Sequence, residues 1–307
     1  MRTQPPPDDL AIVILNWNAA DDTIRCVREI VRWQHLHPTL WIVDNASTDD
    51  SVERIRKHFP DLHLICNEAN LGFAGGNNRG IRAALAEGDH PVMLLNNDAS
   101  VAESDVLRLL ATLREDARIG FVGPLLLDGR GERLLAAGGR NPVLHHLSHL
   151  EAPPCEEAVC TVEYVPGTVL LARAEVFRTV GLLDERYFFS MEVADLCMRA
   201  SRVGYRSVID RRARAYHTLE ARPSALRQTL YVYYIIRNRY LFVRNFYPRG
   251  RFLLVPAWTA YGMALWLKLR MRGQRAAARA VWMGLVDGLR GRFGGQNRRL
   301  LDAVRSV

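Results

Sequence analysis

The most constraining feature of the sequence is an alternation of short apolar runs with segments of helical periodicity over the first 115 residues. Strands that alternate with helices at this interval form a parallel sheet whose faces the helices cover. The sequence therefore predicts an α/β fold with a mainly parallel central sheet. The predicted strands are 10–16, 40–45, 62–67 and 91–96.

Each predicted strand ends on a polar side chain, and these side chains are Asn16, Asp44, Asn67 and Asn96. The carboxyl ends of parallel strands meet at one edge of a sheet. In open α/β sheets, ligands bind in the crevice beyond that edge. We therefore expect the four polar residues to line a common crevice.

The fourth strand leads into Asn97 and Asp98. Asn and Asp initiate turns through hydrogen bonds from side chain to backbone, so the stretch could be only a turn. Alternatively, the carboxylate of Asp98 could hold Mg²⁺ or Mn²⁺, which would neutralise a departing diphosphate. The residues around Asp98 leave both interpretations open.

Two further segments suit a nucleotide. Asp44 stands at a strand end before a small polar turn, where a carboxylate can bind a ribose or base, although it could also be a helix N-cap. Gly72, Gly75 and Gly76 permit close backbone approach, and Asn77 follows them at a helix start. The glycine-rich segment lacks the ending of a P-loop and the spacing of a dinucleotide fingerprint, so alone it is a weak signal.

Glu192 and Asp195 are three residues apart and share one face of a predicted helix that begins near residue 191. Such a face could present a general base to the crevice. The alternative is ordinary surface charge, which the helix dipole favours at a helix N-terminus.

Charge divides the chain into two parts. From Leu226 onward there are 16 basic and two acidic residues, whereas 1–225 contains 25 basic and 31 acidic residues. The basic part indicates a polyanionic partner, either nucleic acid or anionic lipid. The uncharged segment 252–267, flanked by cations and bearing three interfacial aromatic residues, favours lipid. It could lie on a membrane, span it, or form a helical hairpin packed on the preceding domain; Pro256 is expected to interrupt it.

Two observations concern the cellular compartment. The first ten residues contain no apolar run and two aspartates, unlike a signal peptide, so cytosolic exposure is the working assumption. The five cysteines lack the spacing and the His partner of a zinc site. All are expected to be reduced thiols, and they are Cys26, Cys66, Cys155, Cys160 and Cys197.

Taken together, the motifs resemble a family-2 glycosyltransferase of the GT-A fold, in the branch that includes bacterial rhamnosyltransferases acting on cell-surface polysaccharides. The resemblance covers roughly 10–220, and two arginine-rich segments, YYIIRNRYLF and GLVDGLRGRFG, resemble tails found after that domain. Its ordered motifs are VILNWN, IVDNASTDDS, NLGFAGGNNRGI, LLNNDA, VPGTVLLARAEVFRTVGLLDERYFF and ADLCMRA followed by GYR.

The resemblance implies transfer of a sugar, with rhamnose as a candidate, from a nucleotide diphosphate to an acceptor hydroxyl, with inversion. Asp44 would contact the nucleobase. Asp98 would be the last residue of a D-x-D-like metal motif, and His217 a second ligand of Mg²⁺ or Mn²⁺. The other residues assigned to donor binding are Asn16, Trp17 and Asn18 in a first-strand wall, with Asn45, Ser47, Gly76, Asn77 and Asn97.

Two residues depart from the family pattern. Asn96 replaces the first Asp of the metal motif, so the ion would be held partly by the donor's phosphates. Val193 occupies the usual base position of E-D-x-D, and valine cannot accept a proton. Glu192 is therefore the expected base, with Asp195 as the alternative.

These features predict a catalytic domain over 8–223 and a basic helical tail over 224–307. The tail would bind an anionic membrane at the cytoplasmic face of the inner membrane, and the acceptor would be a glycan or a lipid-linked glycan. Nucleic acid is not an expected partner. One alternative is a catalytically silent relative that binds nucleotide sugars as a scaffold, which Val193 motivates. A sugar nucleotidyltransferase would need a glycine- and arginine-rich loop after the first strand, which NWNAADDT does not provide.

Overall fold

A computed structural model describes residues 10–218 and 225–305, and this part of the chain forms two compact units. The first comprises 10–141, 147–183 and 193–218; the second comprises 142–146, 184–192 and 225–305. Two short segments inside the predicted first domain thus belong to the second unit. The predicted boundaries at residue 8 and at 223/224 lie outside the described residues.

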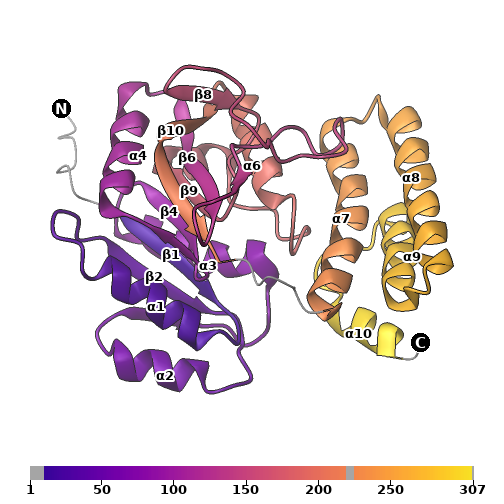
Figure 1. The fold of residues 1–307 in the computed structure, drawn as a ribbon, viewed down its shortest axis with the longest axis horizontal. Helices are drawn as coiled ribbons and strands as arrows, with labels where there is room; N and C mark the ends of the chain where they lie inside the picture. The colour runs from indigo at the N-terminus through magenta and orange to yellow at the C-terminus, as the bar shows by residue number, and fades with distance from the viewer. Residues whose placement is uncertain (1–9, 219–224, 306–307) are drawn as a thin grey trace. The chain divides into compact units, whose positions relative to one another are not determined.

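The first unit is built on one ten-stranded sheet, with the strand order β3-β2-β1-β4-β9-β6-β10-β5, β7 on β6 and β8 on β10 (Figure 1). The strands are β1 (Ala11–Asn16), β2 (Thr39–Asp44), β3 (His63–Cys66), β4 (Val92–Asn96), β5 (Ala99–Val101), β6 (Ile119–Asp128), β7 (Leu134–Ala136), β8 (Val159–Val162), β9 (Val169–Ala172) and β10 (Arg206–His217).

The expected parallel arrangement is confirmed for the first four strands, because β1 pairs in parallel with both β2 and β4, and β2 with β3. Beyond them the sheet becomes mixed. β9 runs antiparallel between β4 and β6, whereas β6 and β10 are parallel to each other. β7 and β8 add further antiparallel pairings, with β6 and β10 respectively.

Helices cover both faces of the sheet, as a parallel sheet requires. Apolar residues of α1 and α4 join the even-numbered residues of β1, such as Ile12 and Ile14, in the main core. Odd-numbered residues of β1 face α3 instead: a Cβ on Gly80 would meet Val13. The helices are α1 (Ala20–Ile30), α2 (Ser51–His58), α3 (Gly72–Glu87), α4 (Glu103–Glu115), α5 (Ala174–Val180) and α6 (Glu192–Ser201).

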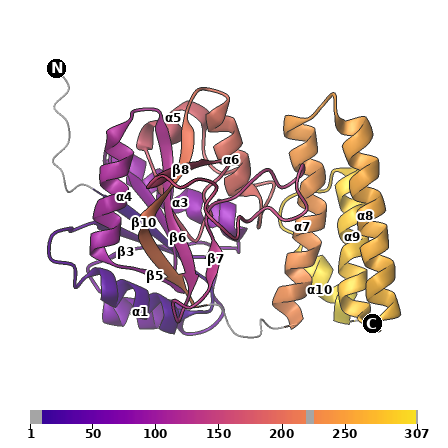
Figure 2. The same cartoon turned by 45° about the horizontal axis from the view of Figure 1, so that its top comes forward.

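The second unit contains four helices in its described part: α7 (Ala225–Phe246), α8 (Arg251–Met271), α9 (Arg275–Arg290) and the short α10 (Asn297–Arg305) (Figure 2). Apolar residues shared by α7, α8 and α9 form its core, including Ile236, Tyr240, Val281 and Leu285. Gly262 allows α8 to approach α9, because a Cβ there would meet the side chain of Leu285.

Helix α8 is longer than the apolar run that predicted it. Pro256 does not interrupt it, contrary to expectation, and the helix continues to Met271. Pro256 has no backbone N–H, so the helix lacks the hydrogen bond to the carbonyl of Phe252 at this point. Among the described residues, α8 is long and apolar enough to cross a membrane by length and composition, and only 6% of its apolar window is buried.

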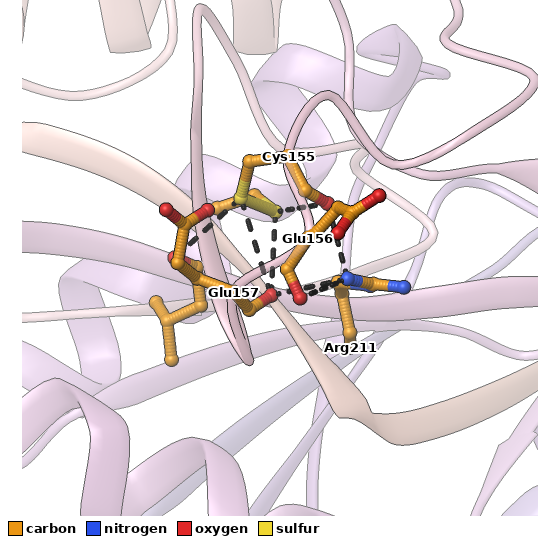
Figure 3. Close-up of a disulfide and its surroundings, with 6 residues drawn as sticks. Cys155, Glu156, Glu157 and Arg211 are labelled. Carbon is orange, nitrogen blue, oxygen red and sulfur yellow. Dashed lines mark hydrogen bonds between the residues drawn. A yellow bond between two sulfur atoms is a disulfide. The ribbon is translucent and has the colours of Figure 1, made fainter.

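The expectation that all five cysteines are reduced is wrong, because Cys155 and Cys160 form a disulfide. Their Cα atoms are 5.7 Å apart, within the range that a disulfide spans. Pairing of β8 with β10 folds residues 155–160 into a tight turn, and Arg211 of β10 donates to the carbonyls of Cys155, Glu156 and Glu157 (Figure 3). Sequence spacing could not reveal this turn.

Thiol counting tests the disulfide. When the denatured, unreduced protein is alkylated, we expect three cysteines to react, Cys26, Cys66 and Cys197. After reduction with dithiothreitol, all five should react. Mass spectrometry of the alkylated peptides gives both counts, and five modified cysteines before reduction would contradict the structure.

Candidate functional site

Polar side chains of neighbouring strands meet at the carboxyl edge of the sheet, as the sequence predicted. Asn16 at the end of β1 lies opposite Asp44 at the end of β2, and Leu15 pairs with Asn96 of β4. Asn16 Nδ2 donates to Asp44 Oδ1 over 2.8 Å. The backbone N–H of Asn67 donates to the carbonyl of Asp44, which brings the end of β3 to the same edge.

Asp44 is the organising carboxylate of this edge. Its Oδ1 accepts from Asn16 and from the Ser47 hydroxyl (2.6 Å), and its Oδ2 accepts from the Ser47 backbone N–H (2.9 Å). The residue is 1% exposed. Asp44 therefore fixes Asn16 and Ser47, and the expected direct contact between Asp44 and a nucleobase stays a prediction.

Thr23 extends the polar network and was missed from the sequence. Its hydroxyl donates to Asn16 Oδ1 (2.7 Å) and accepts from Asn97 Nδ2 (3.0 Å). Asp44, Asn16, Thr23 and Asn97 thus form one hydrogen-bonded chain from β2 to the turn after β4. A threonine among the apolar positions of α1 was the available signal, since Thr23 lies on the buried face of that helix.

The loops that follow β1 and β2 are tied together. The N–H of Asn18 donates to the Ser47 hydroxyl, and Asn18 Oδ1 accepts from the N–H of Thr48. Asn18 and Ala46 both have left-handed backbone (φ 51° and 61°), which is uncommon outside glycine. Trp17 directly precedes Asn18 and is 46% exposed. The edge therefore presents a large aromatic side chain on a rigid loop.

Asn45 supports the glycine-rich segment rather than lining open space. Its Nδ2 donates to Asn70 Oδ1 and to the carbonyl of Gly72, and its Oδ1 accepts from Asn67 Nδ2 and the N–H of Leu71. These bonds use both donors and both acceptor positions of the amide. Asn45 is thereby assigned a positioning role in this structure.

Gly76 and Asn77, which were also predicted to contact the nucleotide sugar, make contacts inside the protein. A Cβ at Gly76 would come within 2.5 Å of Leu15, so the close approach that this glycine permits is between α3 and β1, not toward a nucleotide. Asn77 is buried, and its Nδ2 donates to the Phe73 carbonyl within α3. Gly76 thus packs on β1, whereas the amide of Asn77 bonds within its own helix.

Asp98 and His217 come together from segments 119 residues apart. Strand β5 pairs antiparallel with β10, which places His217 opposite Ala99. His217 Nε2 lies 3.0 Å from Asp98 Oδ1, and the N–H of Thr218 donates to the Asp98 carbonyl. Both side chains are largely buried, with 16% of Asp98 and 11% of His217 exposed. Asp98 is thus more than a turn residue.

The pair fits a divalent cation. A carboxylate oxygen and an imidazole nitrogen face each other, and each can donate a lone pair to one ion. Carboxylate oxygen is a ligand of both Mg²⁺ and Mn²⁺, and imidazole is a common ligand of transition metals. The Asn97 amide is anchored to Thr23 beside Asp98, which joins the pair to the polar edge.

Glu192 and Asp195 occupy different environments on α6. Glu192 begins the helix, is 5% exposed and belongs to the second unit, whereas Asp195 belongs to the first. Asp195 Oδ1 accepts from Arg199 Nε over 2.6 Å, and Arg199 also donates to the carbonyls of Val180 and Leu182. Asp195 therefore anchors its helix to the preceding loop, which favours Glu192 as the base.

This difference predicts a structural effect at Asp195. Replacing Asp195 with asparagine removes the charge that Arg199 faces, and hydrogen bonds to charged groups contribute about 2 kcal/mol. We expect the free energy of unfolding, measured by urea denaturation, to fall by about that amount while transfer activity per folded molecule stays within threefold. Loss of activity without loss of stability would instead make Asp195 the base.

Comparison with known proteins agrees with this arrangement. Residues 11–153, which contain the first four strands and Asp98, match the family model described as glycosyl transferase family 2. The chain carries a family-2 glycosyltransferase domain. Members of this family invert the configuration of the transferred sugar. The prediction of the family from the ordered motifs is thus confirmed.

Curated relatives include a hexosyltransferase of glycan biosynthesis and a rhamnosyltransferase. This glycosyltransferase is 26% identical to the low-salt glycan biosynthesis hexosyltransferase Agl10 of Haloferax volcanii, over 95% of this chain and 94% of the relative. It is 30% identical to the N-acetylglucosaminyl-diphospho-decaprenol L-rhamnosyltransferase of Mycobacterium tuberculosis, over 57% of this chain and 65% of the relative. The chain therefore spans somewhat less than two thirds of that rhamnosyltransferase.

Solved structures confirm the GT-A fold. The mannosyltransferase PcManGT from Pyrobaculum calidifontis, determined with GDP-Man and Mn²⁺, superposes with a TM-score of 0.60 at 15% identity, over 95% of this chain and 90% of that one. GalNAc-T7 with UDP, GalNAc and Mn²⁺ gives 0.57 at 15% identity, over 76% and 50%.

Proposed function

We propose that this glycosyltransferase moves a sugar from a nucleotide-diphosphate donor to a hydroxyl of a lipid-linked or growing cell-envelope glycan, with a divalent cation at Asp98 and His217. The observation that carries the proposal is the 3.0 Å approach of these two side chains at the polar edge of the sheet. The names of the relatives support the acceptor class and make rhamnose a candidate sugar.

Residues of the sheet edge would bind the donor. Trp17 offers an exposed ring on which a nucleobase can stack, and the bond from Asn18 to Ser47 ties its loop to the loop after β2. Asp44 and Asn16 are hydrogen-bonded to each other at the base of these loops. Thr23 and Asn97 continue the hydrogen-bond network to the residue before Asp98. A preorganised edge of this kind lowers the entropic cost of binding.

Chemistry would proceed by a single displacement. Glu192 accepts the proton of the acceptor hydroxyl. At the same time the hydroxyl oxygen bonds to the anomeric carbon, and the bond from that carbon to the diphosphate oxygen breaks. A bound Mn²⁺ or Mg²⁺ supplies charge neutralisation for the departing diphosphate. Attack opposite the leaving group gives the inverted product.

Incubating the protein with dTDP-rhamnose, Mn²⁺ and an N-acetylglucosaminyl-diphospho-polyprenol acceptor tests the proposal. The sugar nucleotides UDP-glucose and GDP-mannose serve as parallel donors. We expect one donor to give a product whose anomeric configuration, measured by NMR, is opposite to that of the donor. Diphosphate binding without transfer from any donor would instead favour the silent scaffold, for which buried Val193 at the usual base position is the motivating observation.

The described part of α8 also supports attachment of the second unit to a membrane surface. Phe252, Leu253 and Met271 are each more than 70% exposed. Cations border the helix at both ends: Arg249, Arg251, Lys268, Arg270 and Arg272. An exposed apolar face with flanking basic residues binds anionic lipid headgroups at the interface. We propose attachment at the cytoplasmic face of the inner membrane, where the nucleotide sugar would be available.

A flotation assay with phosphatidylglycerol vesicles tests this attachment. We expect the protein to float with the vesicles at low salt and to lose about tenfold in bound fraction when Phe252 and Leu253 are both replaced by aspartate. Val203→Asp, at an exposed apolar position of the first unit, is the matched control and should float as wild type does. Equal flotation of all three proteins, or none, would contradict the assignment.

A further inference from the structure

The backbone that leads into Glu192 is held in an unfavourable conformation. Phe188, Ser190 and Met191 have φ values of 65°, 74° and 74°, in the left-handed region that residues with a side chain rarely adopt. Three such residues within four positions directly precede the start of α6. Conformations of this kind persist only where surrounding contacts impose them, and they concentrate at functional sites.

Asn238 of α7 supplies those contacts. It is fully buried, and its Nδ2 lies within hydrogen-bond distance of the carbonyls of Tyr187 (3.1 Å), Phe189 (2.9 Å) and Ser190 (2.8 Å). One amide group therefore contacts three carbonyls of the same four-residue stretch. Both the loop and α7 belong to the second unit.

Arg237 fixes the orientation of that amide. Its Nε and Nη2 donate to Asn238 Oδ1 over 3.0 and 2.8 Å, so Nδ2 must point to the loop. Nη2 also donates to the carbonyls of Arg186 and Tyr187, and Nη1 donates to Gly294. The guanidinium is fully buried and lies 4.7 Å from the centre of the Tyr234 ring.

Aromatic packing holds the same loop from the other side. The Phe188 ring stacks on Tyr234 of α7 with ring centroids 5.2 Å apart. Gly295 allows this ring to approach, since a Cβ there would come within 2.8 Å of it. The loop is therefore bonded through its carbonyls and packed through a side chain against α7 and the segment before α10.

We propose that Arg237 and Asn238 are positioning residues that hold the left-handed loop 188–191 and thereby aim the carboxylate of Glu192. The inference rests on the proposed function, in which Glu192 is the base. It gives α7 a role within its own unit, which is to fix the backbone from which Glu192 extends. A base displaced by about 1 Å loses much of its catalytic effect.

Asn238→Asp tests this role, because aspartate keeps the shape and the acceptor for Arg237 but removes the amide donor. Arg237→Lys is the second variant, because lysine lacks the planar guanidinium that donates twice to Asn238 Oδ1. Arg244→Lys is the matched control: Arg244 lies on the same helix, and its Nη2 donates to the carbonyls of Gly288 and Leu289 at the end of α9.

We expect both test variants to speed amide hydrogen exchange of 187–191 at least tenfold and to lower kcat 10- to 100-fold, with the donor KM within twofold of wild type. The control should change neither quantity. Unchanged exchange and kcat in Asn238→Asp and Arg237→Lys would overturn the inference. A fall in kcat together with a rise in donor KM and faster exchange throughout the unit would also overturn it, because that pattern marks a merely structural role.

A double-variant cycle separates action through Glu192 from action elsewhere. If the loop serves Glu192, adding Asn238→Asp to Glu192→Gln lowers the residual rate little further; multiplicative losses would overturn the inference. Wild-type protein that transfers no sugar would refute the proposed function. In that case the hydrogen exchange of 187–191 still decides whether Asn238 holds the loop.

Discussion

Replacing Asp98 with alanine should lower kcat/KM for sugar transfer about a thousandfold, which corresponds to about 4 kcal/mol of lost transition-state stabilisation. Asp98 supplies the only carboxylate of the predicted metal pair, and His217 alone is a weak ligand for a hard cation. Without the ion, the diphosphate leaves carrying uncompensated charge. Initial rates at saturating acceptor and varied donor measure the effect.

The control for Asp98 is Asp89→Asn, which removes the same charge from an exposed residue paired with Arg178. It should keep wild-type rates. The kcat/KM of His217→Ala should lie between those of Asp98→Ala and Asp89→Asn, because this change removes one ligand but leaves the carboxylate. Wild-type turnover of Asp98→Ala with the true donor would exclude Asp98 from the mechanism.

Replacing Glu192 with glutamine should lower kcat 100- to 10,000-fold, the usual contribution of a positioned general base. Glutamine has nearly the same shape but cannot accept the proton of the acceptor hydroxyl. The nucleotide diphosphate should still bind, since donor binding is assigned to the sheet edge. Single-turnover rates, together with calorimetric binding of the diphosphate, separate the two effects.

The comparison that decides between the two carboxylates pairs Glu192→Gln with Asp195→Asn. The first should lose rate and keep its stability; the second should lose stability and keep most of its rate. The opposite pattern would assign the base to Asp195 and leave Glu192 as a helix-capping charge.

Sequence periodicity was sufficient for the first half of the fold. The apolar runs before Asn16, Asp44 and Asn96 could be assigned to parallel strands because local hydrophobicity and turn residues agree there. The common edge then follows from parallel pairing alone. The antiparallel insertion of β9 between β4 and β6 has no local signature, because it depends on contacts between distant segments.

For the site, the sequence could name candidate residues but not the contacts that each of them makes. Asp98 and His217 were paired through family resemblance, and β5–β10 pairing brings them together. Gly76 and Asn45 were assigned to donor binding, but Gly76 packs against Leu15 and the amide of Asn45 bonds to neighbouring protein groups. Glycine and asparagine serve close packing and loop support as readily as ligand binding, so residue type alone could not separate these roles.

Contacts between distant segments account for what was missed. Thr23 joins Asn16 to Asn97 only once α1 packs beside β1. Asn238 appeared in the sequence as part of an aromatic, arginine-rich helix, with no sign that its amide meets carbonyls about 50 residues earlier. Cys155 and Cys160 likewise required the turn before β8.

The measurement that tests the central claim most directly is the melting temperature of wild type and Asp98→Ala with UDP, dTDP, GDP and ADP, each with and without Mn²⁺. A ligand at 100 times its Kd stabilises the folded state by about 2.7 kcal/mol. We predict that one diphosphate raises the wild-type midpoint by about 5 °C or more only when Mn²⁺ is present, and that Asp98→Ala shows no metal-dependent rise. No shift with any diphosphate, or an equal shift in both proteins, would contradict a metal-assisted donor site at Asp98.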